Sequence, residues 1–154
     1  MKKVSKWNKK EENGTLGNFK MFLGTFEVTL IDRNRLSMPA KIQEEIAGPR
    51  LVLVIGFEEC IFGFREKDWE EVVKPELSRP FFSDDAGREM RRKMCASAKV
   101  IDLGSQRRFV MPKDMVEFAG IVREKVTIIG AGDHFEIWDS QKWYEYQKKL
   151  RKSA

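Results

Sequence analysis

Short apolar stretches alternate with polar turns along the first half of the chain. Apolar residues at positions 26, 28 and 30 are separated by Glu27 and Thr29, which is the period-2 pattern of a half-buried strand. The pattern then predicts a polar turn at 31–35, a short helix at 40–46 that ends at Ala47-Gly48-Pro49, a buried strand at 51–55, a further strand at 60–64, and a helix opened by Trp69.

The second half of the chain repeats this order of elements. Its pattern predicts strands at 99–102, 126–129 and 134–138, a short helix through Met115 that stops at Ala119-Gly120, and a final helix opened by Trp143. Landmark residues recur in the same order at nearly constant spacing, which indicates an internal repeat. Arg35 and Arg108 are 73 positions apart, as are Pro39 and Pro112, while Gly56 and Gly130, and Trp69 and Trp143, are 74 apart.

Each half is too small to bury a core of its own comfortably, so we expect the two halves to pack on each other or on other chains. A charged, helical stretch joins them, interrupted by Pro75, Pro80 and the cluster at 83–85, where Ser83 or Asp84 is expected to cap a helix. The fold class predicted is α+β, mostly β. The expected parts are a basic extension at 1–20, a first domain at 21–67, a helical linker at 68–96, a second domain at 97–141, and a C-terminal helix and tail at 142–154.

Composition changes this picture little. The chain has 154 residues, 42% hydrophobic and 34% charged, which is typical of a soluble globular protein and excludes wholesale disorder. No apolar run approaches the roughly 20 residues that a membrane-spanning helix needs, and no apolar segment follows the lysine-rich start as in a secretory signal. Of the net charge of +5, residues 1–20 carry +4, so we interpret them as a flexible basic arm.

Side chains suited to catalysis or metal binding are sparse. Cys60 and Cys95 are too few for a disulfide framework, and we expect both to be reduced and buried. His134 is the only histidine, which disfavours a structural zinc site and a Ser-His-Asp triad. We expect no cofactor and no metal. Glu58, Glu59, Asp133 and Glu136 are interpreted as turn residues, and Phe62, Phe64, Trp69, Trp138 and Trp143 as residues of the core or of a subunit interface.

Both halves carry a charged tip after their first strand. The first tip is 32–35, Asp-Arg-Asn-Arg, and the second tip is 105–108, Ser-Gln-Arg-Arg. An arginine side chain can form two parallel hydrogen bonds to a guanine edge or to a phosphate, and an amide side chain can form two to adenine. A solvated hairpin tip would explain one such segment, but its recurrence favours a DNA contact. The expected DNA-binding residues are Arg33, Asn34, Arg35, Gln106, Arg107 and Arg108.

Other basic residues are candidates for phosphate contacts, which position a protein on DNA without reading its sequence. Lys41 follows the first tip closely in the chain. A basic run in the linker supplies the others, although a solvated helix face would explain that run equally well. The candidate phosphate contacts are Lys41, Arg91, Arg92 and Lys93.

Several segments, in the same order, resemble those of MraZ proteins. They are the opening MFLGTF at 21–26, RNRLSMPAK at 33–41, GFEEC at 56–60, and the segment from Ile129-Gly130 to HFEIWD at 134–139. The resemblance runs from Met21 to about Tyr146. It implies a bacterial transcription regulator with two domains of the AbrB, or swapped-hairpin, type. Such proteins bind G-rich direct repeats in their own promoter, upstream of the division and cell-wall gene cluster, as ring-shaped homo-oligomers.

The resemblance therefore implies a repressor that is cytoplasmic and nucleoid-associated, with double-stranded DNA and copies of itself as partners, and with no membrane or small-molecule substrate. The chain departs from the family pattern at both tips. Asn34 replaces a glycine, which the turn can accept because asparagine tolerates positive φ. In the second tip either Arg107 or Arg108 could be the family's arginine, and the spacing to Pro112 favours Arg108.

Two other classes of function compete with this one. An AbrB-like antitoxin or protein-interaction module with non-specific DNA affinity would use the charged C-terminal helix at 141–152 to hold a partner. An enzyme is disfavoured because the sequence has no recognisable catalytic constellation.

Overall fold

The computed structural model describes residues 21–153, so the basic extension predicted at 1–20 lies outside the described residues. Two units with the same order of elements follow one another, and they confirm the internal repeat. The first unit contains β1 (Thr25–Thr29), β2 (Arg35–Ser37), α2 (Ala40–Ile46), β3 (Arg50–Ile55), β4 (Ile61–Arg65) and α3 (Glu66–Leu77). After α4 (Asp85–Ser97), the second unit contains β5 (Lys99–Asp102), β6 (Arg108–Val110), α5 (Lys113–Ala119), β7 (Lys125–Gly130), β8 (Phe135–Asp139) and α6 (Ser140–Ser153).

The two units exchange their first strands. Six strands form one sheet in the order β1-β7-β8-β4-β3-β5, and β2 pairs separately with β6. Val28 of β1 lies opposite Val126 of β7, and Ile101 of β5 lies opposite Leu51 of β3, so each first strand joins the third strand of the other unit. The fold is α+β, with two pseudo-repeated, interleaved units of the swapped-hairpin type.

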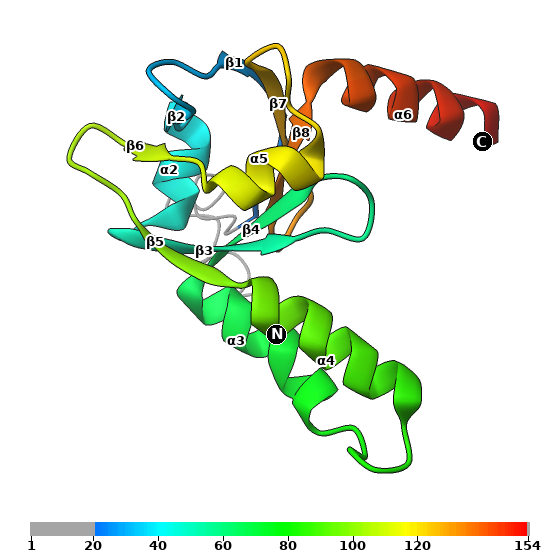
Figure 1. The fold of residues 1–154 in the computed structure, drawn as a ribbon. Coiled ribbons are helices and arrows are strands. Elements are labelled where there is room, and N and C mark those ends of the chain that lie inside the picture. Colours follow the sequence, from blue (N-terminus) through cyan, green and yellow to red (C-terminus); the bar gives the residue numbers. More distant parts are fainter. Residues whose placement is uncertain (1–20, 154) are drawn as a thin grey trace, which may run out of the picture.

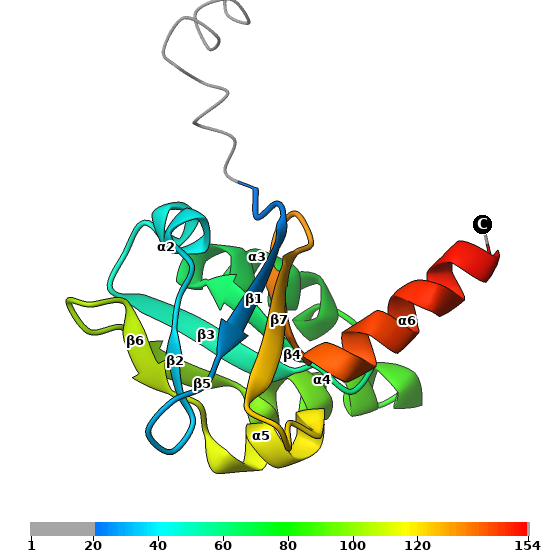
Figure 2. The same ribbon diagram turned by 90° about the horizontal axis from the view of Figure 1, so that it is seen from above.

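Both faces of the sheet are covered, which explains the dense apolar runs. One face, which includes Leu53, Ile61, Ile128 and Ile137, packs in a single core with α2 and α5. On the other face lie α3, α4 and α6, where Trp138 packs on aromatic side chains of α6. Figures 1 and 2 show α2 and α5 on the side of the sheet opposite α3 and α4.

The start of the described chain is anchored by Phe22. Its side chain is fully buried against Phe135, with ring centroids 5.4 Å apart, and its backbone exchanges hydrogen bonds of 2.7 and 3.0 Å with Gly132. A Cβ at Gly130 would lie well inside 3.0 Å of backbone atoms of Phe22 and Leu23. Glycine at position 130 therefore lets the N-terminal segment cross the β7–β8 turn.

The linker forms two helices, and the structure corrects one detail of it. Pro75 lies inside α3 instead of interrupting it: the helix lacks the hydrogen bond that an amide at position 75 would donate, and it ends two residues later, at Leu77. The predicted cap is confirmed at Asp84, whose carboxylate accepts a 2.8 Å hydrogen bond from the Gly87 amide.

The two thiols lie in different environments, contrary to the expectation that both are buried. Cys60 is buried, but Cys95 is exposed on α4. Because α4 packs against α3 and β3 along one face only, a residue on its other face meets solvent.

Candidate nucleic-acid interface

The two tips meet at a small antiparallel ribbon made of β2 and β6. Arg35 lies opposite Val110, Leu36 opposite Phe109, and Ser37 opposite Arg108. Leu36 and Phe109 are buried on the inner face of the ribbon. Since side chains alternate along a strand, the other two pairs share the outer face. The two arginines are diagonal neighbours across the two strands there, with their backbones about 7–8 Å apart.

The first tip is a tight turn with an unusual backbone. Ile31 and Arg35 close it with reciprocal backbone hydrogen bonds of 2.9 and 2.6 Å. The three residues between them, Asp32, Arg33 and Asn34, have φ of 41°, 62° and 69°, in the left-handed region that favours glycine. Asparagine at position 34 is thus accommodated in the conformation that its sequence context predicts.

The second tip is longer, and its hydrogen bonds identify its counterpart residues. The Arg107 amide donates to the Gly104 carbonyl at 2.9 Å, and Arg107 has φ of 59°. The Arg107 carbonyl accepts from the Met38 amide at 2.9 Å, just as the Asn34 carbonyl accepts from the Met111 amide at 2.8 Å. Arg107 therefore corresponds to Asn34, and Arg108 corresponds to Arg35.

This correspondence decides the register that the sequence leaves open between Arg107 and Arg108. It also shows that Gln106 corresponds to Arg33, so the amides of the two tips are not structurally equivalent.

The predicted DNA-binding side chains differ in exposure. Arg33, Gln106 and Arg107 are exposed, whereas Asn34, Arg35 and Arg108 are half-buried. Nε of Arg35 is buried and has no hydrogen-bond partner among the described residues. A buried donor without a hydrogen-bond partner costs about 1–3 kcal/mol. A ligand that rearranges this guanidinium and accepts a hydrogen bond from its Nε would therefore bind more tightly. Among the candidate phosphate contacts, Lys41 is exposed on α2.

The basic run of the linker lies elsewhere. Helix α4 is on the opposite side of the sheet from the ribbon (Figure 1), so the structure does not bring this run together with the tips. Arg91 donates a 3.0 Å hydrogen bond to the Leu77 carbonyl, and Lys93 lies 4.9 Å from the centre of the Phe57 ring. Arg92 is exposed.

The carboxylates near His134 have a structural partner. Nδ1 of His134 lies 2.7 Å from Asp133 and Nε2 lies 2.8 Å from Glu136, which also accepts a 2.9 Å hydrogen bond from the Trp138 indole. Burial by itself lowers the pKa of His134, but these hydrogen bonds outweigh it, and the pKa is raised above 6.5. Residues 21–153 contain no group of three or more side chains placed to hold a metal ion.

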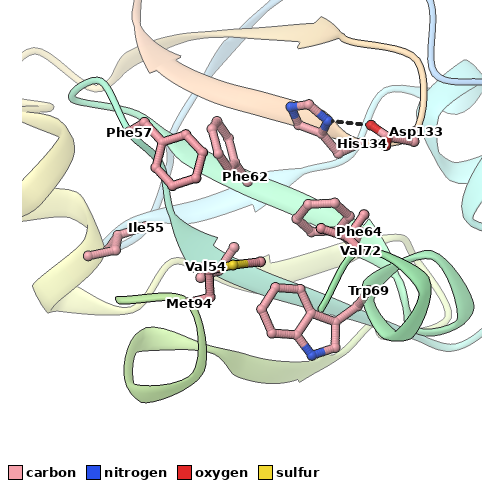
Figure 3. Close-up of a pocket in the computed structure, with 10 residues that line it drawn as sticks. All are labelled: Val54, Ile55, Phe57, Phe62, Phe64, Trp69, Val72, Met94, Asp133 and His134. Atoms are coloured by element: carbon pink, nitrogen blue, oxygen red, sulfur yellow. Dashed lines mark hydrogen bonds and ion pairs between the residues drawn. The ribbon is translucent and has the colours of Figure 1, made fainter. Parts of the chain in front are cut away.

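A pocket that the sequence does not predict lies on the face of the sheet that α3 and α4 cover (Figure 3). It has a volume of about 150 Å³ and lies between β3, β4, α3, α4 and the β7–β8 turn. The alternation of Phe62 and Phe64 indicates a second apolar face of the sheet. The helix residues that line the pocket reach this face only through the tertiary fold. The lining residues are Val54, Ile55, Phe57, Phe62, Phe64, Trp69, Val72, Met94, Asp133 and His134.

Two pseudo-symmetric units with exchanged first strands and a charged tip on each define a swapped-hairpin protein. The family model described as "MraZ protein, putative antitoxin-like" matches residues 21–92 and 94–154. The chain belongs to the MraZ family.

Relatives cover most of the chain. A protein of Syntrophomonas wolfei named "Transcriptional regulator MraZ" is 38% identical over 133 residues, which are 86% of this chain and 91% of the relative. A protein of Micrococcus luteus with the same name is 40% identical over 82% of this chain and 86% of its own length. Among the described residues, no helix has the length and apolar character needed to cross a membrane.

Proposed function

We propose that this protein is a sequence-specific DNA-binding regulator of transcription, not an enzyme, and that the β2–β6 ribbon with its two tips contacts DNA. The observation that carries the proposal is the outer face of the ribbon, where Arg35 and Arg108 are diagonal neighbours. A two-stranded ribbon fits the major groove of B-DNA, and arginine bonds the guanine edge bidentately there. The names of the relatives, all transcriptional regulators, agree with this role.

Within this interface we assign a different role to each residue according to its position. In this proposal Arg35 and Arg108, held by the ribbon, read bases. The exposed tip residues Arg33, Gln106 and Arg107 extend beyond the ribbon to bases or phosphates, and Asn34 shapes the first tip. Lys41, exposed on α2 on the same side of the sheet, contacts a phosphate in this proposal. The run at 91–93 is the weaker candidate, because two of its three side chains are engaged within the fold.

One ribbon makes few phosphate contacts, so binding at physiological salt requires several ribbons acting together. A ring-shaped homo-oligomer whose subunits meet successive G-rich direct repeats would supply this avidity. In this proposal the protein represses its own promoter, upstream of the division and cell-wall gene cluster, by occluding RNA polymerase, and it is associated with the nucleoid.

Fluorescence anisotropy tests the proposal. DNA from upstream of the protein's own gene is titrated against scrambled DNA at about 50 and 200 mM salt. Preference for the native DNA at both concentrations supports sequence reading, whereas equal and steeply salt-sensitive binding to both DNAs refutes it. Replacing Arg35 by alanine should weaken specific binding by about 1–3 kcal/mol. Arg92→Ala, on the opposite side of the sheet, is the comparison: a phosphate contact does not read sequence, so this variant should leave the ratio of the affinities for native and scrambled DNA unchanged.

A protein-interaction module is the second candidate function. Helix α6 contains no buried residue and carries five basic side chains and one acidic side chain, so it presents most of its surface for contact. A stoichiometric protein partner recovered with the full chain, together with no retardation of any DNA, would favour this function.

A further inference from the structure

The outer face of the β2–β6 ribbon carries two uncharged side chains beside its two arginines. Arg35 and Arg108 occupy one diagonal of this face, and Ser37 and Val110 occupy the other. Ser37 lies directly opposite Arg108, and Val110 lies directly opposite Arg35. Each arginine therefore has a small side chain as its nearest neighbour across the ribbon.

Val110 departs from the pattern expected of the outer face. An antiparallel ribbon with one covered face places apolar residues inward and polar residues outward. The exposed Ser37 follows this rule, but Val110 is apolar and 53% exposed. The two residues occupy equivalent positions, because each lies two places after the equivalent arginine of its own unit. The two units therefore differ in chemistry at this position, with a hydroxyl group in one and two methyl groups in the other.

The backbone on both sides of Val110 is held in place. The preceding residue, Phe109, is buried and pairs with Leu36 across the ribbon. The following residue, Met111, is also buried, and its amide donates a 2.8 Å hydrogen bond to the Asn34 carbonyl. The side chain of valine has one torsion with few accessible rotamers. Its methyl groups therefore make a contact without the entropy cost of ordering a long side chain.

The major groove of B-DNA offers such a side chain one apolar partner. Among the groups that the base pairs present there, the 5-methyl group of thymine is the one methyl group, and the others donate or accept hydrogen bonds. The polar atoms of a base edge would lose hydrogen bonds to water against Val110 and gain no partner in exchange. A ribbon that carries Val110 into this groove therefore favours thymine at the position that the valine meets.

The spacing within the ribbon sets where this thymine lies. Directly opposed residues of an antiparallel pair have their Cβ atoms about 4.5–5.5 Å apart. Successive nucleotides of one DNA strand are about 3.4 Å apart along the helix axis. Since Val110 lies directly opposite Arg35, the bases that these two side chains meet are about one or two base steps apart.

We propose that Val110 is a specificity-determining residue that recognises thymine by its 5-methyl group, about one or two base steps from the guanine that Arg35 contacts. Ser37, at the equivalent position beside Arg108, makes no such choice, because a hydroxyl group bonds to several base edges. The two arginines thus favour the same base, and Val110 makes the two ends of the DNA site different. This role rests on the proposed function and adds a second kind of base to those that the ribbon reads.

Deoxyuridine tests this role, because it lacks the 5-methyl group of thymine and keeps the same hydrogen-bonding groups. The full chain is titrated, by fluorescence anisotropy, against DNA from upstream of its own gene that contains either thymine or deoxyuridine throughout. Wild-type protein should bind the thymine duplex about fourfold more tightly or better, since burial of one methyl group contributes roughly that factor. Equal affinity of wild-type protein for the two duplexes overturns the proposal.

Two matched valine variants assign the effect to one residue. Val110→Ala removes both methyl groups of the side chain, so it should bind the thymine and deoxyuridine duplexes equally and still prefer native to scrambled DNA. Val100→Ala removes the same atoms from another exposed strand residue, 59% exposed on β5 and outside the ribbon, and should keep the wild-type preference for thymine. A thymine preference that survives in Val110→Ala overturns the proposal, because another residue or the shape of the DNA then reads the methyl group.

Substitution of single bases tests the spacing. 7-Deazaguanine lacks the N7 acceptor that arginine uses, so a guanine whose replacement weakens wild-type protein but not Arg35→Ala is the guanine that Arg35 contacts. Deoxyuridine placed at one position at a time should then weaken wild-type binding at a thymine within about two base steps of that guanine. A sensitive thymine found only farther away contradicts the proposal.

The same titrations distinguish failure of this role from failure of the proposed function. If wild-type protein prefers native to scrambled DNA but binds the thymine and deoxyuridine duplexes equally, the proposed function stands and the role of Val110 fails. If wild-type protein binds native and scrambled DNA equally and with the same steep salt dependence, the proposed function fails, and the role of Val110 fails with it.

Discussion

At the scale of residues, the backbone of each tip is held by a hydrogen bond from the other unit. The tolerance of Asn34 for positive φ follows from its residue type and is found in the first tip. Gln106 and Asn34, the amide side chains of the two tips, occupy different positions, because the second tip reaches the shared ribbon with a different spacing. Hydrogen bonds to Met38 and Met111 reveal that spacing, and no local pattern encodes them.

His134 should make the stability of the protein depend on pH. Its folded-state pKa is raised, so its contribution to stability is complete below pH 6.5 and is lost as the pH rises through the folded-state pKa. The difference in unfolding free energy between wild-type protein and His134→Asn should therefore be larger near pH 5.5 than near pH 9. Urea denaturation at both pH values measures it. An equal difference at both would show that the contacts with Glu136 and Asp133 do not favour the charged imidazole.

The two cysteines should react at very different rates. Burial, with Glu136 and Glu58 nearby, raises the pKa of the Cys60 thiol far above its ordinary value, so it forms almost no thiolate near neutral pH. Cys95 is exposed. We expect a thiol reagent to label one cysteine rapidly in the native protein and both in denaturant. Cys95→Ser should abolish the rapid phase, and rapid labelling that survives this substitution would contradict the assignment.

At the level of elements, the sequence predicts which segments are helices and strands better than it predicts their partners. Helix α2 and strand β5 have the predicted bounds, and most other elements differ from prediction by one to three residues. The alternation along β1 identifies which of its side chains are buried. It does not identify the strand that pairs with β1, and β2 and β7 fit the pattern equally well. The exchange of strands depends on both units together, so the pattern within one unit cannot specify it.

Gly130 provides a test of the crossing between β7 and the N-terminal segment. Gly130→Ala should lower the free energy of unfolding by about 1–3 kcal/mol, because its Cβ would overlap backbone that cannot move without disturbing Phe22. Gly48→Ala is the matched control, since the nearest atom to its Cβ is a carbonyl oxygen at 3.8 Å. Urea denaturation measures both variants. Equal effects would show that the segment before β1 can shift freely.

At the scale of the whole molecule, the two units depend on each other for their sheet. Strand β1 has its only strand partner in β7, and β5 has its only strand partner in β3, among residues 21–153. A fragment that contains only one half lacks the strand that the other half supplies to its sheet. Such a fragment therefore exposes core residues and leaves strand edges unpaired.

We therefore expect residues 21–97 and 98–154, produced separately, to show no cooperative unfolding transition, and their mixture to regain one. Circular dichroism during thermal denaturation measures this. A cooperative transition in either fragment alone would show that one unit holds a sufficient core without its partner's strand.

Because the two units differ in sequence, the two ends of the β2–β6 ribbon are not equivalent. A dimer of two identical short chains would present the same tip twice about a true two-fold axis, and such symmetry matches a palindromic target. Here one continuous chain supplies Asp-Arg-Asn-Arg at one end of the ribbon and Ser-Gln-Arg-Arg at the other. The two ends of the ribbon therefore differ, and a DNA site contacted by the ribbon as in the proposed function would have a polarity and would not need to be a palindrome.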